Sequence, residues 1–250
     1  MSESTPSVKE RHTRILLALL LLDREKSHNL FNPTIKTVFS LSTESPRTRG
    51  TLRQMLTDGV IRREEEGVYQ ITDRGMGELA LSFPFVRFMM FSWDGKYRII
   101  SYEIPENKRS LRDSLRREIS GWGLGPWHRS FWLTPHPVAE AMKKLVEGTP
   151  WENYIQMFEG TPTLGDPSIL VEKVWNMSAL QEAYKKVFKT WHELLSREDL
   201  SKEAKLAKVV NSYIEVLKTD PGLPKELVGE KWIGKDAFDI FSEMRSILMS

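Results

Sequence analysis

The stretch from Trp93 to Pro135 restricts the fold most, because extended and helical patterns alternate within it at short intervals. Residues Lys96 to Ile104 alternate loosely between apolar and polar side chains and stop at Pro105, which is typical of a strand. Asn107 is suited to cap the helix that follows. The apolar face of that helix consists of Leu111, Leu115 and Ile119. A strand followed by an amphipathic helix indicates a mixed α+β unit.

The pattern beyond this helix continues the alternation. Glycines within residues 121–125 break the helix, and Trp127 to Leu133 is extended again. A helix is expected from Val138 to Glu147, and an extended segment from Trp151 to Phe158. The order strand, helix, strand, helix, strand predicts a ferredoxin-like α+β domain at residues 89–160.

The N-terminal third has a different order, with three helices, a pair of short strands and a fourth helix. Ser45 and Pro46 form a strong helix start, with serine at the cap and proline in the first turn. The expected helices span residues 8–22, 34–41, 45–58 and 73–82, and the expected strands span residues 60–63 and 68–72. This order predicts a winged helix-turn-helix at residues 1–88.

The C-terminal part is expected to be helical. Residues 160–167 are rich in turn-forming glycine and proline, and helical patterns follow them. The expected helices span residues 178–195, 201–217 and 235–248. The predicted fold class is therefore α+β multidomain, with a helical C-terminal domain at residues 161–250.

Composition limits the chemistry and the compartment. The chain of 250 residues contains no cysteine, which excludes disulfides, thiolate zinc sites and cysteine nucleophiles, and fits a cytoplasmic protein. The apolar run from Ile15 to Leu22 is too short to span a bilayer and is interpreted as a buried helix, so we expect no membrane partner. The net charge of +2 does not by itself indicate nucleic acid, so any basic patch has to be local.

One such patch occurs on the expected helix at residues 45–58. The second helix of a helix-turn-helix presents its N-terminal residues to base edges, where arginine donates to guanine and threonine contacts a thymine methyl. Gly50 lets the DNA backbone approach closely, and the wing is expected to contact phosphates. The predicted DNA-binding residues are Arg47, Thr48, Arg49, Thr51, Arg53, Arg62 and Arg63. The alternative is an adaptor that uses the winged helix only for protein contacts.

Catalytic patterns are weak. The five histidines have no pair at metal-ligand spacing, and neither a glycine-rich phosphate loop nor a nucleophile elbow occurs. We therefore expect no catalytic residue, no metal, no cofactor and no enzymatic activity. The alternative is a metal-dependent nuclease built on the middle unit, supported by carboxylates that flank its first strand: Asp94, Glu103 and Glu106.

Several motifs carry a family resemblance. WDGKYRIISYEIPE at residues 93–106 is followed by LRDSLRREI, GWGLGP and FWLTP. Together with Trp175 to Tyr184 and with Asp220 to Phe241, these segments resemble, in the right order, the PaaX family of repressors of phenylacetic-acid catabolic operons. The middle unit also resembles the ferredoxin-like endonucleases associated with CRISPR, although Glu103 stands where those usually carry aspartate.

The resemblance implies a dimeric repressor that leaves its double-stranded DNA operator when an aryl-CoA thioester binds. We expect a small anionic effector beside the middle unit, where a basic helix precedes aromatic residues; the alternative is that this helix is only a solvated face. The predicted effector-binding residues are Arg109, Arg112, Arg116, Trp127 and Trp132.

A homodimer is expected, because two-fold pairing doubles the base contacts of a single winged helix. Its interface is predicted on the apolar faces of the last two helices. These faces consist of Val209, Tyr213, Val216, Leu217, Phe238, Phe241, Met244 and Leu248. The alternative is that the same faces close the tail onto the middle unit.

Overall fold

The computed structural model describes residues 7–249, which form two compact units. The first unit contains residues 7–82, 184–216 and 234–249, and the second contains residues 83–183 and 217–233. The C-terminal helical segment is therefore shared between the two units. The division into three domains stays a prediction, because compactness does not show which segments fold alone.

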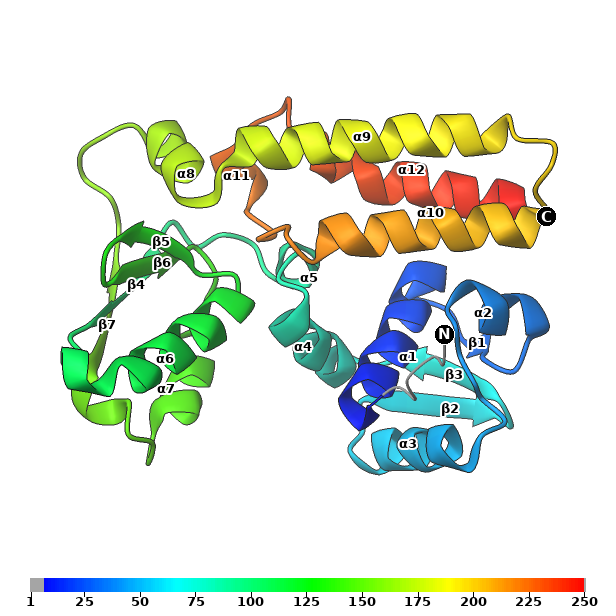
Figure 1. The fold of residues 1–250 in the computed structure, drawn as a ribbon, viewed down its shortest axis with the longest axis horizontal. Coiled ribbons are helices and arrows are strands. Elements are labelled where there is room, and N and C mark those ends of the chain that lie inside the picture. The colour runs from blue at the N-terminus through cyan, green and yellow to red at the C-terminus, as the bar shows by residue number, and fades with distance from the viewer. Residues whose placement is uncertain (1–6, 250) are drawn as a thin grey trace. The chain divides into compact units, whose positions relative to one another are not determined.

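The N-terminal part of the first unit has the helix and strand order expected from the sequence, with one addition. Its elements are α1 (Val8–Asp23), β1 (His28–Asn29), α2 (Pro33–Val38), α3 (Pro46–Thr57), β2 (Ile61–Glu65), β3 (Val68–Ile71) and α4 (Asp73–Ser82). The short strand β1 was not predicted. It pairs with β3, so that the strands form an antiparallel sheet in the order β1-β3-β2 (Figure 1).

Helix α1 lies at the centre of the first unit. Every residue from Ile15 to Leu22 is buried, because α1 contacts α3, α4 and β3 as well as α12 (Gly234–Met249) near the C-terminus. A helix that is apolar on all sides is stable only when it is covered on all sides. Arg245 of α12 donates a 2.6 Å hydrogen bond from Nη1 to the carbonyl oxygen of Leu21. The interpretation of this run as a buried helix is confirmed.

The C-terminal helices of the first unit share an aromatic core. This core joins α9 (Met177–Leu195), α10 (Lys202–Leu217) and α12 through Trp191, Tyr213 and Phe241. The predicted dimer interface is placed on faces that are buried inside the chain. Except for the half-buried Phe238, all its members are buried: Val209, Tyr213, Val216, Leu217, Phe241, Met244 and Leu248. These faces therefore cannot supply a dimer interface without unfolding part of the chain.

The second unit contains a ferredoxin-like sheet. Its elements are α5 (Val86–Met90), β4 (Tyr97–Tyr102), α6 (Arg109–Gly121), β5 (Gly125–His128), β6 (Phe131–Thr134), α7 (Ala139–Val146), β7 (Ile155–Gly160), α8 (Pro167–Trp175) and α11 (Lys225–Val228). The strands are antiparallel in the order β5-β6-β4-β7, and the sequence from β4 to β7 is β-α-β-β-α-β. Helices α6 and α7 lie on one face of the sheet (Figure 1), and their apolar side chains belong to the same core cluster as those of the strands.

Two local expectations for the second unit are wrong, and one helix was not predicted. The single extended segment from Trp127 to Leu133 is a hairpin, because the chain reverses between β5 and β6. Asn107 does not cap α6, since it lies inside a short 3-10 helix, Glu106–Lys108, and α6 begins after Lys108 without a side-chain cap. Helix α8 begins at Pro167, the last residue of the expected turn-rich segment, and was not predicted.

Candidate nucleic-acid interface

Helix α3 begins where serine and proline predict it. The Ser45 hydroxyl accepts a 3.1 Å hydrogen bond from the Thr48 amide, and Pro46 occupies the first turn, where it needs no hydrogen-bond donor. Leu52 and Met55 are buried and hold the helix to the core. The exposed side of α3 therefore has a defined orientation and carries Arg47, Arg49 and Arg53.

A groove runs between α3 and the hairpin formed by β2 and β3. It has a volume of about 520 Å³, and its cationic lining comes from Arg49 and Arg53 of α3 and from Arg63 of β2. The other lining residues are Asn29, Phe31, Leu52, Leu56, Glu66, Gly67 and Tyr69. Within residues 7–249, the side chains of the three arginines make no hydrogen bond or ion pair. The fold thus brings together three predicted DNA-binding residues from two elements and leaves their guanidinium groups free for an outside partner.

The remaining predicted DNA-binding residues lie outside this groove. Arg47 is exposed and lines a different cavity, beside α1. Arg62 points to the other side of β2, where its Nε donates a 2.8 Å hydrogen bond to Oε1 of Gln70. Thr48 and Thr51 are only 2% and 6% exposed, so they present almost no surface to a base. Their hydroxyl groups are used inside the chain, that of Thr51 by donating to the carbonyl oxygen of Arg47 at 3.0 Å.

Sequence reasoning missed the part of the groove that comes from β1 and the chain after it. Phe31 and Asn29 lie against Gly67, whose φ is +81°, at the tip of the hairpin between β2 and β3. The Asn29 side chain accepts a 2.9 Å hydrogen bond from the Phe31 amide. A strand of two residues leaves no periodic pattern in the sequence, so its contribution could be found only from the pairing with β3.

The arginines predicted to bind an effector have partners within the second unit. Arg112 pairs with Glu106 at 2.7 Å, and Arg116 donates from Nε to the Tyr102 hydroxyl at 2.7 Å. Arg109 approaches Asp113 at 3.6 Å, in a largely exposed pair. The two predicted tryptophans differ in exposure. Trp127 is 40% exposed, whereas Trp132 is only 8% exposed and belongs to the core between the sheet and its helices.

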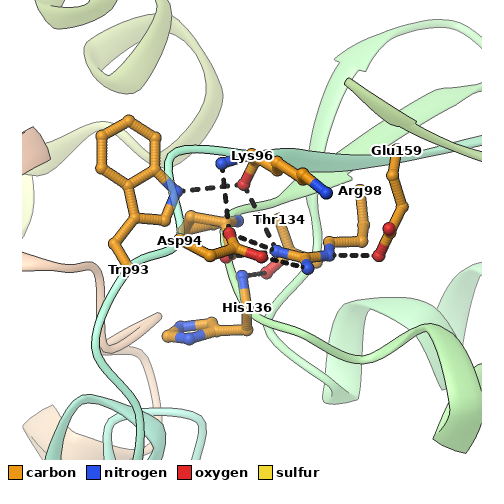
Figure 2. Close-up of polar contacts among 8 residues, drawn as sticks. Trp93, Asp94, Lys96, Arg98, Thr134, His136 and Glu159 are labelled. Carbon is orange, nitrogen blue, oxygen red and sulfur yellow. Dashed lines mark hydrogen bonds and ion pairs between the residues drawn. The ribbon is translucent and has the colours of Figure 1, made fainter. Parts of the chain in front are cut away.

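The carboxylates considered for a nuclease lie apart, at the two ends of β4. Asp94 precedes the strand and accepts two hydrogen bonds from Arg98, at 2.9 Å from Nη1 and 2.6 Å from Nη2 (Figure 2). Glu103 and Glu106 follow the strand, and Glu106 is paired with Arg112. Within residues 7–249, no group of three or more histidine, aspartate or glutamate side chains is placed to hold a metal ion.

The residues around Asp94 form a bracing network instead. Arg98 also donates from Nε to Glu159 of β7 at 2.7 Å and from Nη1 to the carbonyl oxygen of Pro135 at 3.2 Å (Figure 2). Trp93 donates from its indole nitrogen to the carbonyl oxygen of Lys96. The hydrogen bonds from Arg98 lower the pKa of Asp94 to about 2. The start of the WDGKYR motif therefore ties β4 to β7 and to the chain after β6.

Nearby His136 is also structural. Its amide donates to Thr134, and its ring contacts the carbonyl oxygen of Pro221 at 3.1 Å. Burial lowers the pKa of His136 to about 4, so the ring is neutral at physiological pH.

The comparisons with known proteins cover most of the chain. The model of the PaaX protein central Cas2-like domain matches residues 91–171, and the model of the PaaX-like protein C-terminal domain matches residues 175–250. Among solved structures, the uncharacterized protein Rv0674 from Mycobacterium tuberculosis is similar in fold, with a TM-score of 0.51 and 18% sequence identity. That match covers 94% of this chain and 97% of the other. No curated protein matches the chain. Among the described residues, no helix is both long and apolar enough to cross a membrane.

Proposed function

The chain belongs to the PaaX family and has a Cas2-like middle domain, and from this premise we propose that it is a DNA-binding transcriptional regulator. The observation that carries the proposal is the groove between α3 and the β2–β3 hairpin, lined by Arg49, Arg53 and Arg63. Three guanidinium groups without partners among the described residues fit a polyanion better than they fit a protein surface of mixed charge.

We propose that residues 1–88 act as a winged helix-turn-helix. In this arrangement α3 enters the major groove and the β2–β3 hairpin lies beside it as the wing. Arg49 and Arg53 then reach base edges or nearby phosphates, and Arg63 contacts a phosphate across the groove. Glu64, Glu65 and Glu66 make the tip of the hairpin acidic, which disfavours insertion of the tip into the minor groove, so the phosphate contact is assigned to Arg63.

Five further features of the regulator are proposals. It acts as a repressor in the cytoplasm, it has no catalytic activity of its own, it binds its operator as a homodimer, and a small anionic effector such as an aryl-CoA thioester releases it. The support is the chain's resemblance to the PaaX family of repressors of catabolic operons and the need for two half-sites to give a winged helix enough base contacts. The dimer requires a surface other than the buried faces of α10 and α12. Light scattering that gives a monomer mass both with and without operator would exclude the homodimer.

A salt titration with matched charge variants tests DNA binding. The operator is selected from random duplexes, and its affinity is measured by fluorescence anisotropy from low to moderate salt. The variant Arg49→Gln/Arg53→Gln/Arg63→Gln should reduce the slope of log K against log salt by roughly 0.9 for each arginine that contacts a phosphate, and so by about 2.7 if all three do. The control Arg109→Gln/Arg112→Gln/Arg117→Gln removes the same charge from α6 and should keep the slope. An equal loss in the two variants would contradict the assignment of the interface to α3 and the hairpin.

A further inference from the structure

A second cavity lies at the N-terminal end of α3, between α1 and the turn that joins α2 to α3. Its volume is about 390 Å³, within the usual range of small-molecule sites. The cavity is lined by Arg11, Arg14, Ile15, Ser40, Leu41, Ser42, Ser45, Pro46, Arg47 and Thr48. All these residues belong to the first unit, so the cavity is formed within one compact body.

The walls of the cavity are held in place by local hydrogen bonds. Ser40 ends α2 in the left-handed conformation, with φ of +52°, and the Leu41 amide donates to the carbonyl oxygen of Lys36 at 2.9 Å. A non-glycine residue in this conformation is uncommon and carries strain. Lys36 also pairs with Glu44 across the turn at 2.5 Å. A turn fixed in this way forms a pocket wall before any ligand arrives.

The lining combines an apolar surface with a cationic rim. Ile15, Leu41 and Pro46 supply apolar surface, while Arg11, Arg14 and Arg47 carry positive charge. The carboxylate of Glu10 pairs with Arg14 at 2.6 Å, but among residues 7–249 neither Glu10 nor any other acidic residue lines the cavity. The N-terminus of α3 adds a partial positive charge at the same place. This chemistry suits an anion with an apolar body.

The volume sets the size of the ligand. At about 30 Å³ for each water molecule, the cavity has room for roughly 13 waters, or a ligand of about a dozen non-hydrogen atoms. A benzoate- or phenylpropionate-sized carboxylate fits that space. A CoA thioester has several times as many atoms and would extend well beyond the cavity.

We propose that this cavity binds a small apolar carboxylate and that the bound carboxylate weakens DNA binding by the adjoining α3. The effect on DNA binding rests on the proposed function, whereas carboxylate binding does not. The coupling has a structural route: Arg47 belongs both to the cavity and to the exposed side of α3, and Arg11 reaches the Thr51 hydroxyl of α3 at 3.5 Å. A carboxylate that draws these guanidinium groups inward binds the DNA-free state more tightly, which is the condition for regulation.

The first experiment measures carboxylate binding to the full chain without DNA. Benzoate, 3-phenylpropionate and octanoate are titrated by calorimetry, with benzamide as a neutral control. At least one carboxylate should bind, and benzamide should bind at least tenfold more weakly. Arg11→Gln/Arg14→Gln should weaken carboxylate binding tenfold or more, whereas Lys143→Gln/Lys144→Gln, which removes the same charge from exposed positions of α7, should leave it unchanged. Absence of binding by all three carboxylates would overturn the proposal.

A cavity-filling variant keeps the test independent of charge. Ser42→Trp adds bulk at an exposed lining position, and folding is checked by circular dichroism. The folded variant should bind carboxylates at least tenfold more weakly, and binding equal to that of the parent would exclude this cavity. Adding the same carboxylates to the complex of the parent chain with its operator should weaken DNA binding. If the carboxylate binds but operator affinity does not change, the regulatory half is wrong; if the chain binds no DNA at all, the proposed function fails while the cavity is still tested.

Discussion

Replacing Gly50 with alanine should stabilise the chain and at the same time weaken its binding to DNA. Gly50 is an exposed interior residue of α3, and a methyl group added there would meet no atom within 4 Å. Alanine is favoured over glycine inside a helix by about 0.5–1 kcal/mol, so the free energy of unfolding should rise by that amount. Because the new methyl group stands where the DNA approaches α3, operator affinity should fall about tenfold, or about 1.4 kcal/mol.

A second glycine provides the matched control. Gly77 lies inside α4, and a methyl group added there also meets no atom within 4 Å. Gly77→Ala should raise the urea midpoint by a similar amount and leave operator affinity unchanged. Urea unfolding followed by circular dichroism gives the stability, and fluorescence anisotropy gives the affinity. If Gly50→Ala is more stable and binds the operator as tightly as the parent, α3 does not approach DNA closely and the reasoning fails.

Three further predictions test the fold. Gly222→Ala should cost about 2 kcal/mol or more in urea unfolding, because φ at Gly222 is +61° and the added methyl would lie 2.5 Å from the Cα of Phe85; stability equal to the parent would show that this contact is loose. Asp94 should stabilise the second unit fully above about pH 4 and lose that effect as the pH falls towards about 2, because Arg98 lowers its pKa to about 2 in the folded state. Asp94→Asn should therefore flatten acid unfolding in this range, and an unchanged profile would contradict the role of the pair. Trp191→Ala should destabilise the first unit by about 3–5 kcal/mol, since this side chain is 1% exposed; a loss below 1 kcal/mol would mean that the aromatic core can collapse around the gap.

The sequence predicted elements well where a local signal marks their ends. Ser45 and Pro46 locate the start of α3, and the residue range of α4 agrees with the prediction. A similar signal, a capping residue followed by proline, was overlooked at α8. There Asp166 caps the helix by accepting a 2.8 Å hydrogen bond from the Ser168 amide, and Pro167 occupies the first position. The hairpin of β5 and β6 was missed because its turn contains Arg129 and Ser130 and no glycine.

The sequence indicated which types of residue line the candidate site, but only some of the predicted residues lie in the groove. The arginines of α3 could be identified because they are charged and follow a helix start, whereas the burial of Thr48 and Thr51 depends on packing within the first unit. Arg62 and Arg63 could have been separated from the sequence alone, because adjacent residues of a strand point to opposite faces. The pairing of α1 with α12 could not be predicted, since Leu21 and Arg245 are 224 residues apart and leave no periodic signal.

Contacts between distant parts of the sequence also explain why the apolar faces of α10 and α12 were wrongly assigned to a dimer interface. Tyr213 and Phe241 each lie on an apolar helix face that was assigned to a dimer interface. Their ring centroids are instead 4.9 Å apart in the core of the first unit. A helical apolar face shows that a partner exists, but it does not show whether that partner is a second copy or the same chain.

Sequencing of genomic DNA captured by the purified chain tests the central claim most directly. The parent and the Arg49→Gln/Arg53→Gln variant are each incubated with fragmented DNA of the source organism at physiological salt, with Arg109→Gln/Arg112→Gln as the charge-matched control. The account predicts that the parent and the control enrich the same recurring sequence motif and that the α3 variant loses it. Either the absence of any enriched motif for the parent, or the same motif retained at the same strength by the folded α3 variant, would contradict the claim that this chain regulates transcription by binding DNA through α3.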